Sequence, residues 1–215
     1  MKSARAEDTW HVAPIGGEVR PELQTCLWSN DWQTACNNSL TRQNQVVAED
    51  FARCVQLSHA SWQWNNALWY PGWTTWPSAN KHNALAAAAS LGYQLELLEV
   101  KAARTTSFGY DNVDTISVTA SLRNRGVAPP YYELALRFEY PCRSNQTSSL
   151  LVPLSRDLLM PSSTAKKVTG VLEPPAMAKG PHTLCVSLAS SMARKPVKFA
   201  VNEVRADGRV LVFNV

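Results

Sequence analysis

From residue 93 onward, apolar and polar residues alternate in short runs. Alternation with a period of two is typical of strands that bury one face. Turn-forming pairs such as Pro129-Pro130 and Asp207-Gly208 separate the runs. About eight short strands in about 120 residues favour an antiparallel β-sandwich. The strands are predicted at 93–100, 115–123, 132–140, 150–154, 166–172, 183–189, 198–204 and 209–215.

The residues before 93 follow a different pattern, in which strands and helices take turns. A short strand is predicted at 12–19 and a second at 58–65. Apolar residues at helical spacing predict a helix at 41–57, with Thr41 as its N-cap. An alanine-rich helix is predicted at 80–91 and ends before Gly92. The region between the first strand and first helix is expected to lack regular structure.

A strand–helix–strand–helix order is what α/β architecture produces. Two strands and two helices are only about a quarter of an eightfold barrel, whose usual length is roughly 250 residues. We therefore predict an α+β fold in two parts. Residues 1–92 form a partial (β/α) barrel remnant, and residues 93–215 form an all-β antiparallel β-sandwich.

The charge is uneven along the 215 residues. Residues 1–92 hold six Lys/Arg and seven Asp/Glu, whereas 93–215 hold fifteen and ten. The basic residues are spread over several segments rather than gathered in a stripe with aromatics, so we expect no nucleic-acid partner. No segment approaches the roughly 18 apolar residues of a membrane span.

The five cysteines contain no Cys-x-x-Cys pair, which argues against zinc. They fit an oxidised, secreted protein and a set of buried free thiols equally well. Possible glycosylation sequons at 37–39 and 145–147 agree with secretion. Because residues 1–10 carry charges and no hydrophobic stretch, they do not resemble a signal peptide. For an extracellular protein, the signal would lie upstream of this chain.

All eight tryptophans lie between Trp10 and Trp76. Indole rings stack well on sugar rings and also fill cores. Trp69, Trp73 and Trp76 occur among Pro and Gly, where packing demand is lower, and they are the candidates for an exposed sugar platform.

Glu18 is the carboxylate best placed for catalysis. It follows two glycines at the end of the first predicted strand, and barrel enzymes build their sites at the carboxyl ends of strands. Arg20 would keep that carboxylate ionised or contact a substrate hydroxyl. The alternative is a strand-end glutamate that faces water or caps a helix.

The second candidate group lies on the predicted strand at 58–65. Alternation places His59 and Asn65 on a polar face that would line a site. Trp62 and Trp64 fall on the opposite face, and we favour core packing for them. Glycoside hydrolysis ordinarily requires two carboxylates about 5–9.5 Å apart, and only Glu18 is well placed. The histidines lack metal-ligand spacing, and no nucleotide-binding motif occurs, so no metal or cofactor is expected.

Four motifs occur in an order that resembles one family. They are Pro-Ile-Gly-Gly-Glu at 14–18, His-Ala-Ser-Trp at 59–62 with Asn65, Leu-Gly-Tyr at 91–93 and Leu-Arg-Asn-Arg-Gly-Val-Ala-Pro at 122–129. The chain resembles the carboxyl-terminal part of the family called domain of unknown function 4832. Proteins of that family look like glycoside-hydrolase-type barrels followed by a β-sandwich.

The resemblance implies that residues 1–92 are the last strands and helices of a barrel, with Glu18 at its mouth and His59 and Asn65 near it. It implies a carbohydrate partner and a catalytic role for Glu18 in the complete barrel. Since most of the barrel is missing, little turnover is expected from this chain alone. The alternatives are a carbohydrate-binding module that uses Trp69, Trp73 and Trp76, and an adhesion β-sandwich whose aromatics are all buried.

Overall fold

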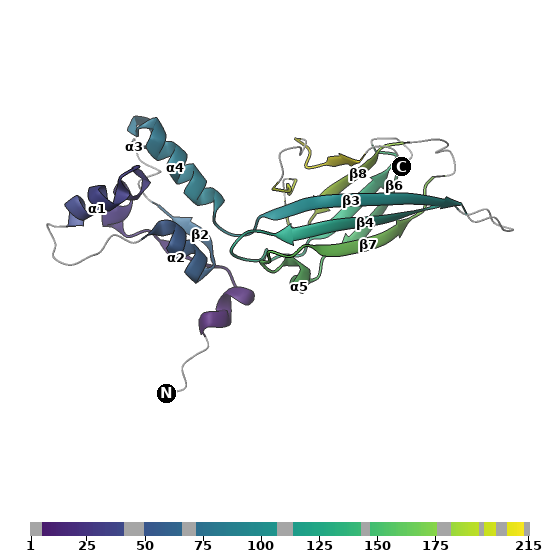
Figure 1. Cartoon of the computed structure of the whole chain (residues 1–215), viewed down its shortest axis with the longest axis horizontal. Coiled ribbons are helices and arrows are strands. Elements are labelled where there is room, and N and C mark those ends of the chain that lie inside the picture. The colour runs from purple at the N-terminus through teal and green to yellow at the C-terminus, as the bar shows by residue number, and fades with distance from the viewer. Residues whose placement is uncertain are drawn as a thin grey trace. The chain divides into compact units, whose positions relative to one another are not determined.

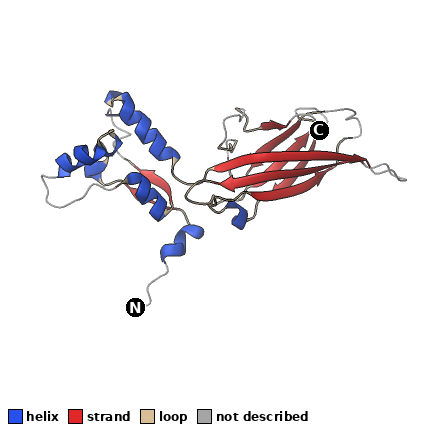
Figure 2. Cartoon of the chain, viewed as in Figure 1, coloured by secondary structure: helices blue, strands red, loops and turns tan. Residues whose placement is uncertain are grey.

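The computed structural model describes residues 6–40, 50–65, 72–106, 114–142, 147–175, 182–193, 196–200 and 206–212. The fold is mixed α+β, with sheets that are mostly antiparallel (Figures 1 and 2). The chain divides into two compact units. Unit 1 consists of Met1–Tyr93 together with Gly126–Pro129, and unit 2 consists of Gln94–Arg125 and Pro130–Val215.

Unit 1 contains short helices and one two-stranded sheet. Its elements in chain order are η1 (Ala6–His11), β1 (Ile15–Glu18), η2 (Pro21–Leu23), η3 (Cys26–Trp28), α1 (Trp32–Leu40), α2 (Phe51–Ser58), β2 (Ala60–Trp64), α3 (Gly72–Thr75) and α4 (Ser78–Ala89). The first and last predicted elements of this unit, a strand and an alanine-rich helix, are present as β1 and α4.

The two strands of unit 1 run parallel. Ile15 pairs with Ala60, and the register then shifts by one residue so that Glu18 pairs with Trp64. The pairing continues beyond β1, where the Val19 backbone N–H donates to the Trp64 carbonyl at 2.9 Å. A parallel pair requires a crossover of a dozen or more residues, and the segment containing α1 and α2 provides it.

The bounds of helix α2 are determined by a capping residue at each end. The Asp50 carboxylate accepts a hydrogen bond from the Arg53 backbone N–H at 3.2 Å, as an N-cap residue does. At the other end, His59 adopts a left-handed conformation with φ of 52° and terminates the helix. The predicted cap Thr41 lies outside the described residues.

The core of unit 1 is small. Val19, Leu23 and Cys36 form its buried cluster, and Cys36 is joined to Cys26 by a disulfide. Helix α1 was not predicted, although Trp32, Ala35 and Cys36 have helical spacing. The polar residues between and after them hid this apolar face, so the expectation of an irregular region here is wrong.

Unit 2 is built from two antiparallel sheets. One sheet has the order β3-β4-β7 (Figure 1), and the other has the order β6-β5-β8-β9. A short helix, α5 (Arg156–Leu159), precedes β7. The strands are β3 (Leu95–Thr106), β4 (Asp114–Asn124), β5 (Ala135–Tyr140), β6 (Ser148–Pro153), β7 (Lys166–Leu172), β8 (Leu184–Ala189) and β9 (Val210–Val212).

Alternate residues of these strands are buried, as the sequence pattern predicted. Ile116, Val118, Ala120 and Leu122 of β4 are all 1 % exposed or less. The two sheets meet where β7 approaches β6, since a Cβ added to Gly170 would lie 2.6 Å from the Leu150 side chain. The mostly antiparallel strands of residues 93–215 are therefore confirmed, whereas a sandwich joined to a barrel remnant stays a prediction.

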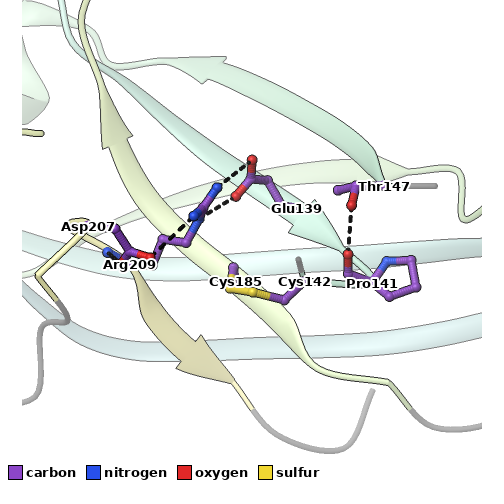
Figure 3. Close-up of polar contacts among 7 residues, drawn as sticks. All are labelled: Glu139, Pro141, Cys142, Thr147, Cys185, Asp207 and Arg209. Carbon is purple, nitrogen blue, oxygen red and sulfur yellow. Dashed lines mark hydrogen bonds and ion pairs between the residues drawn. A yellow bond between two sulfur atoms is a disulfide. The ribbon is translucent and has the colours of Figure 1, made fainter. Parts of the chain in front are cut away.

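A second disulfide joins Cys142 to Cys185 of β8 (Figure 3). Of the two readings of the cysteines, the structure therefore agrees with the oxidised one, and disulfides are typical of oxidising compartments. The fifth cysteine, Cys54, is exposed on α2. Among the described residues, no helix is long and apolar enough to cross a membrane.

Candidate functional site

The open face of the β1–β2 sheet carries two aromatic side chains and a carboxylate. Paired residues on neighbouring strands point to the same side of a sheet, so Glu18 lies beside Trp64 and Gly16 beside Trp62. Trp62 is 50 % exposed and Trp64 is 48 % exposed, and Glu18 is exposed too. The preference for core packing of these two tryptophans is therefore wrong. A sheet of only two strands covers too little area to bury them.

Gly16 fixes the position of the Trp62 indole. A Cβ added to Gly16 would lie 2.4 Å from the Trp62 carbonyl oxygen and 2.5 Å from its ring atoms. The indole thus lies directly against the β1 backbone, which no side chain other than hydrogen would allow. The neighbouring Gly17 has no atom within 4 Å of the same added position. The first glycine of the pair therefore makes room for a tryptophan of the protein itself.

Gln24 joins the carboxyl ends of the two strands. Its side-chain Nε2 donates to Glu18 Oε1 at 3.2 Å and to the Val19 carbonyl at 2.8 Å. Its own carbonyl accepts from Asn65 Nδ2 at 3.2 Å and from Trp28 Nε1 at 2.8 Å. Gln24 and Asn65 are 5 % and 6 % exposed. Glu18 and Asn65, both predicted as site residues, thus contact the same buried residue, Glu18 through the Gln24 side-chain amide and Asn65 through the Gln24 backbone carbonyl.

Gln24 is a residue of the candidate site that the sequence did not reveal. It lies just after η2, where no motif singles it out, and its importance comes only from the chain turning back over the strand end. An amide N–H orients the Glu18 carboxylate without neutralising it. Arg20, expected to keep that carboxylate ionised or to contact a substrate hydroxyl, is exposed, and within the described residues it forms no ion pair with Glu18.

His59 lies at the other end of β2. The strand begins at Ala60, one residue after His59, so the expectation that His59 opens a polar strand face is wrong. A ring nitrogen, Nδ1, is 2.6 Å from the Val127 carbonyl, and the imidazole stacks on Trp10 with ring centroids 3.6 Å apart. Since the carboxyl end of β2 carries Asn65, His59 belongs to the packing at its amino end.

Of the three tryptophans predicted to form a sugar platform, the structure describes two, Trp73 and Trp76. Trp73 and Trp76 lie with ring centroids 5.8 Å apart and an angle of 50° between the rings, and both are half-buried. The Lys81 ammonium lies 5.9 Å from the Trp73 ring, within reach of a cation–π contact. Trp69 lies outside the described residues. The tilt means that the pair does not form one flat platform.

The described part of the chain contains no group of side chains that could bind a metal ion. There, no three His, Cys, Asp or Glu residues are gathered closely enough to hold an ion. The chemistry that the β1–β2 face offers is that of stacking surfaces and one hydrogen-bond-accepting carboxylate.

No protein-family model matches this sequence, and no curated protein matches it significantly. The resemblance to the domain of unknown function 4832 family therefore stays a prediction.

Proposed function

We propose that this chain is part of an extracellular carbohydrate-active protein and that it binds a saccharide on the open face of β1 and β2. The observation that carries the proposal is the face itself, where Trp62 and Trp64 are half exposed beside the exposed carboxylate of Glu18. Aromatic rings stack on the C–H faces of sugars, and a carboxylate accepts hydrogen bonds from sugar hydroxyls.

The order of elements supports the further interpretation that unit 1 is the end of a (β/α) barrel and unit 2 a β-sandwich. Strand β1, the crossover with α2, and β2 form a parallel pair, as consecutive barrel strands do. In that interpretation, Glu18 and Asn65 would lie at the barrel mouth. Glycoside hydrolysis ordinarily needs two carboxylates, and the β1–β2 pair contributes one. We therefore propose binding without turnover for this chain, with Glu18 acting as acid, base or nucleophile only in a complete barrel.

The location is part of the same proposal. Two disulfides, Cys26–Cys36 and Cys142–Cys185, support an extracellular or cell-surface protein, because thiols stay reduced in most cytosols. An adhesion module remains the alternative, and it would use the same surface without a preference for sugars.

The test is calorimetric titration of the chain with a panel of neutral oligosaccharides. For a sugar that binds, Trp64→Ala is expected to weaken binding about tenfold, equivalent to about 1.4 kcal/mol. Glu18→Gln keeps the shape of the side chain and removes its charge, and we expect about tenfold weaker binding from it as well.

Trp73→Ala is the matched control, because it truncates a tryptophan outside the β1–β2 face. It should leave the affinity unchanged. Loss of binding in Trp73→Ala alone would move the saccharide site to α3. If no sugar binds, the adhesion alternative is favoured. Thermal melts of each variant would verify that it is folded.

A further inference from the structure

Unit 2 contains a groove that the proposed function does not use. It has a volume of about 850 Å³ and lies over the four-stranded sheet, where β5, β6 and β8 form its floor. Residues of the segments 190–193, 196–197 and 207–209 border it. A volume of this size is within the range of small-molecule sites and exceeds that of one sugar ring.

The floor of the groove is set by strand register. Arg137 of β5 pairs with Leu151 of β6 on one side and with Ser187 of β8 on the other. The three side chains therefore form a row across the outer face of the sheet, with a guanidinium in the middle, an apolar surface beside it and a hydroxyl opposite. Leu151 is 53 % exposed and Arg137 is exposed.

The second arginine of the groove is already occupied. Arg209 donates to Glu139 from Nε at 2.8 Å and from Nη2 at 3.3 Å, and its Nη1 donates to Asp207 at 3.3 Å (Figure 3). These hydrogen bonds raise the pKa of Arg209 above its ordinary value, and the bond to Glu139 has the largest effect. The Arg209 guanidinium is thus a fixed part of the wall.

Arg137 differs from Arg209 in this respect. It lies two residues before Glu139 on the same face of β5, but both Glu139 oxygens already accept from Arg209. Among the residues that the structure describes, no carboxylate forms an ion pair with Arg137. A guanidinium has five N–H donors in a planar fork that fits a carboxylate. An exposed fork at the centre of a groove floor is suited to a ligand that brings the carboxylate.

We propose that this groove binds a carboxylate-bearing saccharide, such as a hexuronate oligosaccharide, and that Arg137 pairs with its carboxylate. The choice of a saccharide rests on the proposed function, whereas the carboxylate follows from Arg137 itself. Ser187 and Asp207 would exchange hydrogen bonds with sugar hydroxyls, and Leu151 would contact the C–H face of a ring. The chain would then hold a neutral saccharide on unit 1 and an acidic one on unit 2.

The test uses a hexuronate trisaccharide and its carboxyl-reduced, neutral counterpart in calorimetric titrations of the full chain. Arg137→Gln is expected to weaken binding of the hexuronate about 10- to 100-fold, because charge-assisted hydrogen bonds are lost. Arg137→Lys should recover part of the affinity, since it keeps the charge and loses the fork. The neutral counterpart should bind wild-type protein as weakly as the hexuronate binds Arg137→Gln, and added salt should weaken only the hexuronate.

Arg125→Gln is the matched control, because it removes the same charge from an exposed arginine that pairs with Glu96 at the end of the other sheet. It should leave hexuronate binding unchanged. Equal affinity in wild type and Arg137→Gln would overturn the proposal, as would equal loss in Arg125→Gln. A peptide with a free terminal carboxylate that binds more tightly than the hexuronate would overturn the choice of a saccharide.

The two proposals fail separately. If Trp64→Ala weakens the binding of neutral sugars and Arg137→Gln leaves the affinity for the hexuronate unchanged, the groove proposal is wrong. The proposed saccharide site on unit 1 is then still supported. If neutral sugars do not bind and hexuronate binding depends on Arg137, the reverse holds.

Discussion

Both units contain β-sheets, but the two units differ in how far the side chains on their strands are buried. In unit 2, β4, β5 and β8 bury alternate side chains almost completely, including Phe138 at 0 % exposure. In unit 1, the strands β1 and β2 leave Trp62 and Trp64 half exposed. The difference comes from the number of strands, because two short strands offer too small a surface for another layer to cover. Large apolar side chains on such a pair are therefore available to a ligand.

The largest expected effect is the loss of stability when an aromatic side chain is truncated to alanine. Phe138→Ala should lower the free energy of unfolding by about 3–5 kcal/mol, since it leaves a cavity in a packed core. Trp62→Ala removes a larger side chain, yet we expect only about 1–2 kcal/mol, because half of that side chain already contacts water. Urea unfolding of both variants measures the difference. Equal losses would mean that Trp62 is as tightly packed as Phe138.

The disulfides provide the next comparison. Cys142 and Cys185 are separated by 43 positions, and Cys26 and Cys36 by 10. A longer closed loop restricts the unfolded chain more, so removal of the first pair should cost about 4 kcal/mol and removal of the second about 3 kcal/mol. The measurement is urea unfolding of the two double Cys→Ala variants. A larger loss from the Cys26–Cys36 pair would show that chain entropy does not set the order.

A buried asparagine in each unit gives a smaller effect. In unit 2, Asn124 is 0 % exposed, accepts from the Gln94 backbone N–H at 2.9 Å and donates to the Leu159 carbonyl at 2.8 Å. Asn124→Ala should cost about 2–3 kcal/mol, since two backbone groups lose a partner. Asn65→Ala in unit 1 should cost about 1 kcal/mol, because the Gln24 carbonyl keeps its bond from Trp28. Chemical denaturation measures the stability of both variants. A greater loss of stability in Asn65→Ala than in Asn124→Ala would contradict the prediction.

The last comparison concerns the neighbouring glycines of β1 and includes the smallest predicted effect, that of Gly17→Ala. Gly16→Ala should destabilise the protein by about 1–3 kcal/mol, because the new methyl group meets Trp62. Gly17→Ala should change the stability by no more than about 0.5 kcal/mol, since its position is open. Thermal unfolding of the two variants measures the difference. Equal destabilisation would mean that the backbone conformation, rather than the indole, requires glycine.

The sequence predicted β3 to β9 of unit 2, because a period of two persists over each strand and turn residues separate them. The strand predicted at 198–204 is wrong for residues 198–200, which are not in a strand, and residues 201–204 lie outside the described residues. The sequence predicted β1, β2 and α4 within a few residues, but it missed α1, whose apolar face is narrow. It misjudged Trp62 and Trp64, since alternation reveals which residues share a face and not whether anything covers that face.

The candidate site was predictable only in part. Glu18 and Asn65 could be singled out from the sequence because strand ends can be located from the pattern, and the structure brings them to one residue, Gln24. The role of Gln24, which connects them, depends on contacts between segments that are distant in the sequence. His59 was misplaced by one residue, and that single residue separates a strand face from a helix cap.

Unit 1 is discontinuous in sequence, because Gly126–Pro129 belongs to it although β4 and β5 on either side belong to unit 2. In that return segment, the Val127 and Ala128 N–H groups donate to the Gly92 carbonyl, and the Val127 carbonyl lies 2.6 Å from His59 Nδ1. A gene rearrangement that joined residues 1–93 to another protein would leave these four residues behind. The two units are therefore expected to be inherited together rather than shuffled as separate modules.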